Sequence, residues 1–452
     1  MLEAYFKLRE HGTTVGVEVL AGLTTFMVMA YIIFVNPAIL SFAGVPALQG
    51  QGPPFAATLA ATCLVAALMT AAMGLVTNYP LAIASGMGLN AAVAFQLIAG
   101  HKLPWPAAMG VIFLEGVAIT LLVLVGVREA VANAIPMSQK RAISVGIGLF
   151  ILFIGLVNGG IVKAGEGTPV TLGPLATPRV AVAVVGLLLT VLLLALGVRA
   201  ALLLGIAATT LLAIVVNALG GGQVWTLPGM AVVPAHIVAW PDFSTLGQGV
   251  NFEVFTRLSL AVALLTIFSI MLSDFFDTVG TVIGIGAEAS WLDEQGRLPR
   301  LNRVLLVDSV AAIVGGAASA SSATTYIESA AGVAAGGRTG LTAVVVAVCF
   351  ALALFFAPLA GVVPPEATAA ALVIVGYLMC TLVRDIPFAD LEEGFPALLT
   401  LTLMPLTYSI SNGIGAGFIA YVFIKLVRGK AGDVHPMMYA AAAAFVLYFA
   451  AH

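Results

Sequence analysis

Charged residues are scarce in this chain. Its 452 residues include 18 lysines and arginines and 21 aspartates and glutamates, so only 9% carry charge, against about a quarter in ordinary soluble domains. Hydrophobic residues make up 61% of the sequence, and the mean hydropathy is +1.12. This composition predicts a polytopic membrane protein whose main partner is the lipid bilayer. The net charge of −3 and the lack of a basic tract give no indication of a nucleic-acid partner.

Residues that bind metals or form disulfides are also few. The three cysteines, Cys63, Cys349 and Cys380, lie far apart in apolar stretches, and the five histidines are scattered. Neither pattern indicates a disulfide framework or a metal site. The sequence contains no GxxxxGK[ST] motif for ATP phosphates, and the apolar segments contain no nucleophile–base pair. We therefore expect no cofactor, no metal and no enzymatic activity.

Fifteen apolar runs are long enough to be considered as membrane segments, and the total falls to fourteen if one of the last three does not span. The third and tenth, which contain PLAIASGMGLNAAVAF and SSATTYIESAAGVAAGG, are short and interrupted by Gly, Ser and Thr. We expect an all-α fold in which short extended stretches break these two segments. The runs are 15–40, 56–77, 81–99, 105–127, 141–158, 179–198, 200–219, 258–287, 302–320, 322–337, 340–360, 366–383, 394–411, 412–428 and 435–451.

The basic residues predict an orientation. With the N-terminus in the cytoplasm, fourteen of the 18 lysines and arginines fall on the cytoplasmic side, as expected from the positive-inside rule. The four on the other side are Lys102, Lys163, Arg179 and Arg257. We predict a multi-pass protein of a plasma-membrane-like bilayer with a cytoplasmic N-terminus.

A faint internal repeat relates the two halves of the chain. Asn90 and Glu328 are 238 residues apart, and so are Asn36 and Asp274. Seven segments in each half place the halves in opposite topology, which is typical of transporters. The predicted units are a first repeat at 1–220, an extracellular loop at 221–257 and a second repeat at 258–452.

The stretch SDFFDTVGTVIG places two acids inside an otherwise apolar segment. A carboxylate at bilayer depth costs about 2.5–3.5 kcal/mol on insertion scales. On a helix, Asp274, Asp277, Thr278 and Thr281 share one face, and we expect that face to line a polar cavity between helices. The alternative is that both carboxylates only bond neighbouring helices. Glu115 and Asp308 are isolated acids that we expect to be structural hydrogen-bonding groups, and we expect Glu18 to be exposed near its segment end.

The two broken segments predict a binding site. We expect extended stretches at 81–85 and 321–325, each followed by a half-helix that begins near Asn90 or Glu328. Carboxylates accept hydrogen bonds from ring N–H and amino groups, while an asparagine both donates and accepts. This pattern suits a nucleobase. The alternatives are a purely structural hydrogen bond for Glu328 and helix capping for Asn90.

Four motifs together resemble one transporter family. The stretches GVEVLAGLTTFMVMAYIIFVNPAIL, SGMGLNAAVAF, SDFFDTVGTVIG and TTYIESAAGVAAGGRTGLTAV are similar to the AzgA-like adenine/guanine/hypoxanthine permeases of the nucleobase:cation symporter-2 superfamily. The resemblance runs over essentially the whole chain. It implies proton symport of purine bases by a homodimer in the cell (inner) membrane. Each protomer would have fourteen segments in two inverted repeats, with a core domain of segments 1–4 and 8–11 and a gate domain of segments 5–7 and 12–14.

The resemblance also implies roles for individual residues. Asn90, Asp274 and Glu328 match the substrate-contacting positions, and Asp277 matches an acid needed for transport. Tyr326 and Phe275 are weaker candidates for contacts beside the base, because packing alone also explains them. Glu328 is followed by Ser-Ala-Ala-Gly, which departs from the Gln/Glu-Asn-x-Gly element of the uracil and xanthine members and argues against those bases as the main substrate.

Proton coupling follows as a hypothesis. Burial disfavours the charged form of a carboxyl group, and a second carboxylate three residues away disfavours it further. We therefore expect either Asp274 or Asp277 to hold the transported proton. The alternative function on the same fold is an anion transporter or channel of the sulfate-permease type, which a site with three acids and no basic residue disfavours.

Overall fold

The computed structural model describes residues 2–125, 134–165, 167–225, 230–234, 236–289, 291 and 298–450. Within these residues, ten helices are long and apolar enough to cross a membrane. Lipid offers no partner for a backbone N–H or C=O group, so apolar runs of this length form helices that bond internally. The prediction of a polytopic helical membrane protein is confirmed. Arg128 and Arg297, two of the fourteen basic residues predicted to be cytoplasmic, lie outside the described residues.

The helices pack in two groups. The first group joins the beginning of the chain to its later part, because α15 packs against α2 and α4, and α13 packs against α4 and α6. The long helices of this group are α2 (Val15–Met29), α3 (Ile32–Leu40), α4 (Phe55–Thr77), α6 (Trp105–Val125), α12 (Leu260–Glu288), α13 (Leu301–Ala317) and α15 (Gly340–Ala353).

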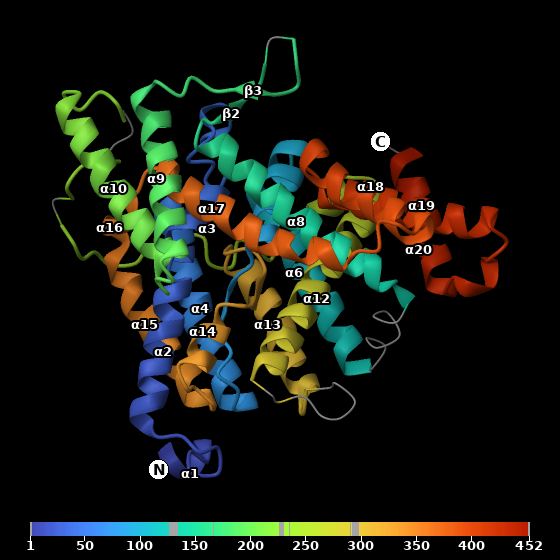
Figure 1. Cartoon of the computed structure of the whole chain (residues 1–452), viewed down its shortest axis with the longest axis horizontal. Helices are drawn as coiled ribbons and strands as arrows, with labels where there is room; N and C mark the ends of the chain where they lie inside the picture. Colours follow the sequence, from blue (N-terminus) through green and yellow to red (C-terminus); the bar gives the residue numbers. More distant parts are fainter. Residues whose placement is uncertain are drawn as a thin grey trace.

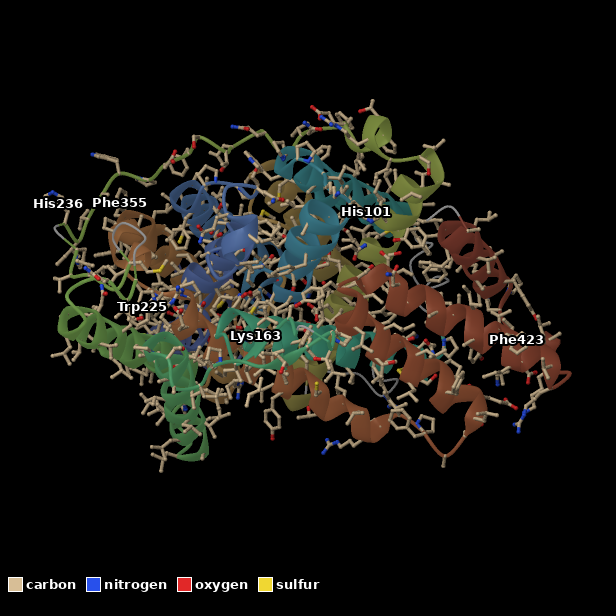
Figure 2. The ribbon with its side chains drawn as sticks, turned by 90° about the horizontal axis from the view of Figure 1, so that it is seen from above. His101, Lys163, Trp225, His236, Phe355 and Phe423 are labelled. Atoms are coloured by element: carbon tan, nitrogen blue, oxygen red, sulfur yellow. The ribbon has the colours of Figure 1, made fainter. Side chains whose placement is uncertain are left out.

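In the second group, α8 packs against α17 and α18, and α17 also packs against α9 and α10. Figure 1 shows α8 and α17 crossing the middle of the molecule, with α9 and α10 on the left and α18 to α20 on the right. Seen from above, this group lies along one long side and the first group along the other (Figure 2). Its helices are α8 (Met137–Asn158), α9 (Pro178–Ala195), α10 (Ala201–Leu219), α17 (Pro365–Cys380), α18 (Leu391–Thr407), α19 (Ile410–Val427) and α20 (Pro436–Ala450).

Short elements connect the long helices. A β-hairpin of β2 and β3 follows α8, pairing Val162 with Leu172. The short elements are α1 (Leu2–Phe6), η1 (Pro46–Leu48), β1 (Ile83–Ser85), α5 (Met87–Ala91), the π-helical η2 (Ala92–Gly100), β2 (Val162–Lys163), β3 (Thr171–Leu172), α11 (Val254–Arg257), β4 (Ala323–Thr325), α14 (Ser329–Ala334), η3 (Leu354–Phe356), α16 (Ala357–Gly361), η4 (Thr381–Asp385) and η5 (Ala431–Asp433).

The two interrupted segments meet at the centre of the first group. β1 pairs antiparallel with β4, with Ala84 opposite Thr324, and all six strand residues are buried. Extended backbone inside a membrane protein needs a partner for its N–H and C=O groups, and each strand supplies it for the other. Both strands fall within the stretches predicted to be extended, and α14 begins directly after Glu328 as predicted.

Small residues let helices of the first group approach closely. A Cβ atom on Gly340 of α15 would stand 1.9 Å from the carbonyl oxygen of Gly74 in α4, so only glycine fits there. The start of α15 is held by Glu18, whose carboxylate accepts the backbone N–H groups of Arg338, Thr339 and Thr342 at 2.9, 3.3 and 3.2 Å. The expectation that Glu18 is exposed is therefore wrong, because a helix start offers free N–H donors that a buried carboxylate satisfies.

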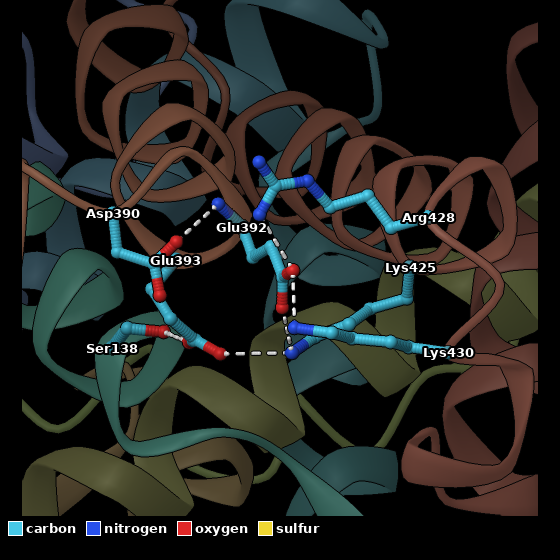
Figure 3. A network of polar contacts seen from close by, with 7 residues as sticks. All are labelled: Ser138, Asp390, Glu392, Glu393, Lys425, Arg428 and Lys430. Atoms are coloured by element: carbon cyan, nitrogen blue, oxygen red, sulfur yellow. Dashed lines mark hydrogen bonds and ion pairs between the residues drawn. The ribbon is translucent and has the colours of Figure 1, made fainter.

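A charged network ties α18 to the end of α19 in the second group (Figure 3). Glu392 is buried and accepts hydrogen bonds from Arg428, Lys425 and Lys430 at 2.8, 2.7 and 2.6 Å. These bonds lower the pKa of Glu392 to about 2.

Neither α18 nor α20 is among the ten helices long and apolar enough to span a membrane, whereas α19 is. Of the last three predicted apolar runs, only the run that contains α19 has a described helix long and apolar enough to span.

Candidate functional site

A cavity of about 480 Å³ lies between the two groups of helices. One wall comes from Tyr31, the start of α5, α12 and the chain after β4, and the other wall comes from α8, α17 and η4. The α17 residues in the lining, Val375, Leu378 and Met379, lie near the end of that helix, and Thr381 and Leu382 of η4 follow them. The cavity therefore lies towards the end of α17, which precedes Arg384. Its lining residues are Tyr31, Gly86, Met87, Gly88, Leu89, Ser144, Ile147, Ile151, Ser273, Phe276, Asp277, Gly280, Thr281, Thr324, Thr325, Tyr326, Ile327, Glu328, Val375, Leu378, Met379, Thr381 and Leu382.

The polar face predicted for α12 divides between two environments. Asp277 and Thr281, one turn apart, line the cavity. Asp274 and Thr278, also one turn apart, are fully buried and point to neighbouring elements instead. A stripe at i, i+3, i+4 and i+7 is wide enough for its two edges to meet different neighbours. The helix therefore presents one of its two central acids to the cavity in this conformation.

Asp274 lies behind the cavity among other polar groups. Ser322 donates its hydroxyl to Oδ2 of Asp274 at 3.2 Å, whereas Oδ1 has no hydrogen-bond partner among the described residues. Glu115 of α6 is fully buried beside Asp274 and Ser322. Two carboxyl groups in such close, dry contact cannot both carry charge without a large cost.

Asp308 of α13 organises the strand that leads to the cavity. Its Oδ1 accepts the backbone N–H and the hydroxyl of Thr325 at 2.8 and 2.7 Å, and its Oδ2 accepts the hydroxyl of Thr278 at 2.6 Å. Thr278 is also 2.7 Å from the hydroxyl of Thr324. These bonds join α12, α13 and β4, in agreement with the structural role expected for Asp308.

Glu328 precedes α14 and lines the cavity. Tyr31, which lies between α2 and α3, donates its hydroxyl to Oε1 of Glu328 at 2.5 Å. Tyr326 also lines the cavity, and its hydroxyl donates to the carbonyl oxygen of Ser85 at 2.5 Å. The predicted residues Glu328, Tyr326 and Asp277 are thus brought together around one space.

Asn90, Asp274 and Phe275 lie behind the lining instead. Asn90 is fully buried in α5, and neither its Oδ1 nor its Nδ2 has a hydrogen-bond partner among the described residues, so it does not cap a helix. Phe275 is buried against Phe276, with ring centroids 5.0 Å apart, and only Phe276 reaches the cavity. A buried amide without partners is costly, which makes Asn90 available to a ligand or to water.

The lining has a clear chemical character. It contains the two carboxyl groups of Asp277 and Glu328 and several hydroxyl groups, and no lysine, arginine or histidine is among the described residues that form it. Apolar walls come from Phe276, Ile147 and Met379. Such a cavity can bind a flat, uncharged molecule through its N–H groups and enclose its faces with apolar side chains.

Sequence reasoning missed Tyr31 and Phe276. Tyr31 lies in the apolar run AYIIF and is 297 residues from Glu328. No local pattern connects the two, because their contact depends on how α14 packs against α2. Phe276 directly follows Phe275, so only the rotation of α12 decides which of the two rings reaches the cavity.

The sequence matches known permeases over nearly its whole length. The model of the Permease family matches residues 16–415. The chain is 40% identical over 447 residues to the adenine permease AdeP of Escherichia coli, covering 99% of this chain and 95% of AdeP. It is 41% identical over 438 residues to the guanine/hypoxanthine permease PbuO of Bacillus subtilis, covering 96% of each.

A solved structure has a similar fold. The transmembrane domain of the cyanobacterial bicarbonate transporter BicA matches with a TM-score of 0.61 and covers 88% of this chain and 96% of that domain. The sequence identity is 15%. At this identity the likeness concerns the arrangement of helices alone.

Proposed function

The chain belongs to the Permease family, and we propose that it is a secondary active transporter that imports purine nucleobases by proton symport with alternating access. The observation that carries this proposal is the cavity between the two helix groups, with Asp277 and Glu328 in its lining. The names of its relatives support adenine, guanine and hypoxanthine as the substrates. In this function the chain is a carrier and not an enzyme.

The chemistry of the lining suits a purine base. Ring and amino N–H groups of the base donate to Glu328, which offers acceptors. The absence of a basic side chain among the described lining residues favours an uncharged ligand over an anion. We propose that Glu328 and Tyr326 contact the base. Asn90, Asp274 and Phe275 lie behind the lining in this conformation, and we propose that they also take part in substrate binding.

Asp277 is the proposed proton-coupling acid, with Asp274 as the second candidate. A proton on Asp277 removes a repulsive charge from the cavity and favours entry of the neutral base. The first helix group, which carries β1, β4 and both acids, then moves against the second group and exposes the cavity to the other side. Release of the proton restores the charge and weakens binding on that side.

The finer architecture is part of the same proposal. It comprises fourteen segments in two inverted repeats, with core and gate domains, and a homodimer in the inner membrane with a cytoplasmic N-terminus. With this orientation, the cavity lies in the cytoplasmic half and the conformation faces inward. The antiparallel pairing of β1 with β4 supports inverted halves, because each half contributes one broken segment to the same place.

The second candidate is an anion transporter of the sulfate-permease type. The similarity of the fold to the transmembrane domain of a bicarbonate transporter favours it. The carboxyl groups of Asp277 and Glu328 oppose it, because they repel an anion from the same space.

Uptake of radiolabelled hypoxanthine into cells lacking their own purine carriers tests the proposal. We expect saturable uptake that a protonophore abolishes and that unlabelled adenine or guanine inhibits, with xanthine and uracil much weaker. Uptake that persists in the presence of the protonophore would rule out proton coupling. Failure of well-expressed protein to take up any base, combined with uptake of labelled sulfate or bicarbonate, would establish the anion carrier instead.

A further inference from the structure

A second cavity, of about 460 Å³, lies at the other end of α8 and α17. The same two helices thus line both cavities. α8 contributes Ser144 to Ile151 to the first cavity and Val157 onward to the second, about 9 Å further along the helix at 1.5 Å per residue. We call this space the outer cavity. It is lined by Gly44, Val157, Asn158, Gly159, Gly160, Thr177, Pro178, Arg179, Val180, Val224 and Glu366.

Two charged residues in the outer cavity neutralise each other. Glu366 is buried, and its carboxylate accepts hydrogen bonds from Nε of Arg179 at 2.6 Å and from the indole N–H of Trp225 at 2.9 Å. The Arg179 side chain is 45% exposed and makes no further hydrogen bond with the described residues. A guanidinium has five N–H donors, so most of those on Arg179, which lines the cavity, have no partner among the described residues. The balanced charge favours a neutral ligand that accepts hydrogen bonds.

Asn158 is the residue that points to a ligand. It lines the outer cavity and is only 7% exposed, yet its amide makes no hydrogen bond with any described residue, and Oδ1 is buried. Keeping an amide buried without a partner costs free energy, and a leucine or valine would fill the same space without that cost. An asparagine here is explained by a bound molecule that both donates and accepts hydrogen bonds.

The outer cavity also adjoins the contact between the two helix groups. Gly44 follows α3 of the first group and packs directly on Asn158 at the end of α8. A Cβ atom on Gly44 would stand 2.8 Å from Cγ of Asn158. This contact joins the two groups at the end of α8 opposite the first cavity. In the proposed transport cycle, the two groups separate beside a molecule that Asn158 holds.

We propose that the outer cavity is a second nucleobase-binding site, in which Asn158 and Arg179 hydrogen-bond the polar edge of a purine base before it enters the pathway. The inference rests on the proposed function and adds a site to it. Arg179 donates to a ring nitrogen or carbonyl oxygen of the base, and Asn158 both donates and accepts. Val157, Val180 and Val224 provide apolar contacts for the ring. The volume is close to that of the first cavity, so one base fits in either.

Equilibrium binding of radiolabelled hypoxanthine to the full-length protein in detergent tests the proposal. We expect two bound molecules per chain in the wild type, one in Glu328→Gln, which disables the first cavity, and one in Asn158→Ala. The site retained by Asn158→Ala shows that this variant is folded. Arg257→Gln is the matched control, because Arg257 pairs with Glu253 at 3.5 Å outside both cavities and its loss leaves two sites.

Transport gives a second readout. Asn158→Ala and Arg179→Gln each lose one or two hydrogen bonds at the outer cavity, so the KM for uptake rises roughly tenfold while kcat changes little. Arg257→Gln should have the KM and kcat of the wild type. A single wild-type site that Glu328→Gln abolishes completely would overturn the outer site and leave the proposed function standing. Absence of any purine binding by the wild type would overturn the proposed function itself.

Discussion

Thr325 donates both its backbone N–H and its hydroxyl to Oδ1 of Asp308, at 2.8 and 2.7 Å. The other carboxylate oxygen accepts the hydroxyl of Thr278 at 2.6 Å. β4 has only three residues, so its position depends on such side-chain anchors as much as on its pairing with β1. Through this carboxylate, α13 fixes the strand that leads to Glu328.

Asp308→Ala is expected to destabilise the protein. The substitution leaves the two buried donors of Thr325 without this acceptor, and each costs about 1–3 kcal/mol. The hydroxyl of Thr278 loses its bond to Asp308 but still has Thr324 as a partner. We expect a marked fall in the melting temperature in detergent and loss of purine uptake. Asp242 is exposed and, among the described residues, accepts only the N–H of Ser244. Asp242→Ala is therefore the control and should melt with the wild type. Equal melting temperatures for the Asp308 variant and the wild type would contradict this role.

Tyr31→Phe is expected to weaken substrate binding while the fold is kept. The phenol is the hydrogen-bond donor to Oε1 of Glu328, and its removal frees the carboxylate to turn away from the base. A hydrogen bond to a charged group contributes about 1.5–3 kcal/mol, so the KM for hypoxanthine should rise by about tenfold or more. Tyr377→Phe, an exposed tyrosine of α17, should leave the KM unchanged. An unaltered KM in the Tyr31 variant would show that Glu328 needs no orienting donor.

The sequence was sufficient to predict the broken segments but not the division of α12. Proline, glycine and a run of serine and threonine at 80–86 and 319–325 disfavour regular helix, so extended stretches follow from local chemistry. Whether Asp274 or Asp277 faces the cavity depends on the rotation of α12 against α6 and α13. That rotation is decided by tertiary packing, which local periodicity does not specify.

Asp277→Asn is expected to separate binding from accumulation. The amide keeps the size of the side chain that lines the cavity and mimics a permanently protonated acid. Vesicles containing this variant should exchange labelled for unlabelled hypoxanthine but should not accumulate it when the outside is acidified. Asp385→Asn at the end of η4 serves as the control. If Asp277→Asn accumulated hypoxanthine against a gradient, Asp277 would not be the proton-coupling acid, and Asp274 would be the next candidate.

Gly332→Ala is expected to displace α14 and with it Glu328. A Cβ atom at this position would stand 2.1 Å from Oγ1 of Thr25 and 2.9 Å from the carbonyl oxygen of Ala21 in α2. Overpacking of this kind costs about 1–3 kcal/mol. We expect a lower melting temperature and a higher KM for hypoxanthine. Gly361→Ala meets no atom within 4 Å, so its properties should match the wild type. A Gly332 variant with wild-type uptake would mean that α14 tolerates displacement.

Glu392 predicts how stability at the α18–α19 contact depends on pH. Hydrogen bonds from Arg428, Lys425 and Lys430 lower its pKa from 4.5 to about 2, so the ionised form stabilises the folded state above about pH 4.5. This contribution falls as the pH drops from 4.5 through 2, because the unfolded chain takes up the proton first. We expect the melting temperature of Glu392→Gln to be lower than that of the wild type, by a constant difference from about pH 5 to 8. This difference in melting temperature should shrink towards pH 3. Glu10→Gln, which removes an exposed pair with Lys7, should melt with the wild type throughout. If the difference in melting temperature between Glu392→Gln and the wild type stayed constant down to pH 3, the charge of Glu392 would not be what holds these helices together.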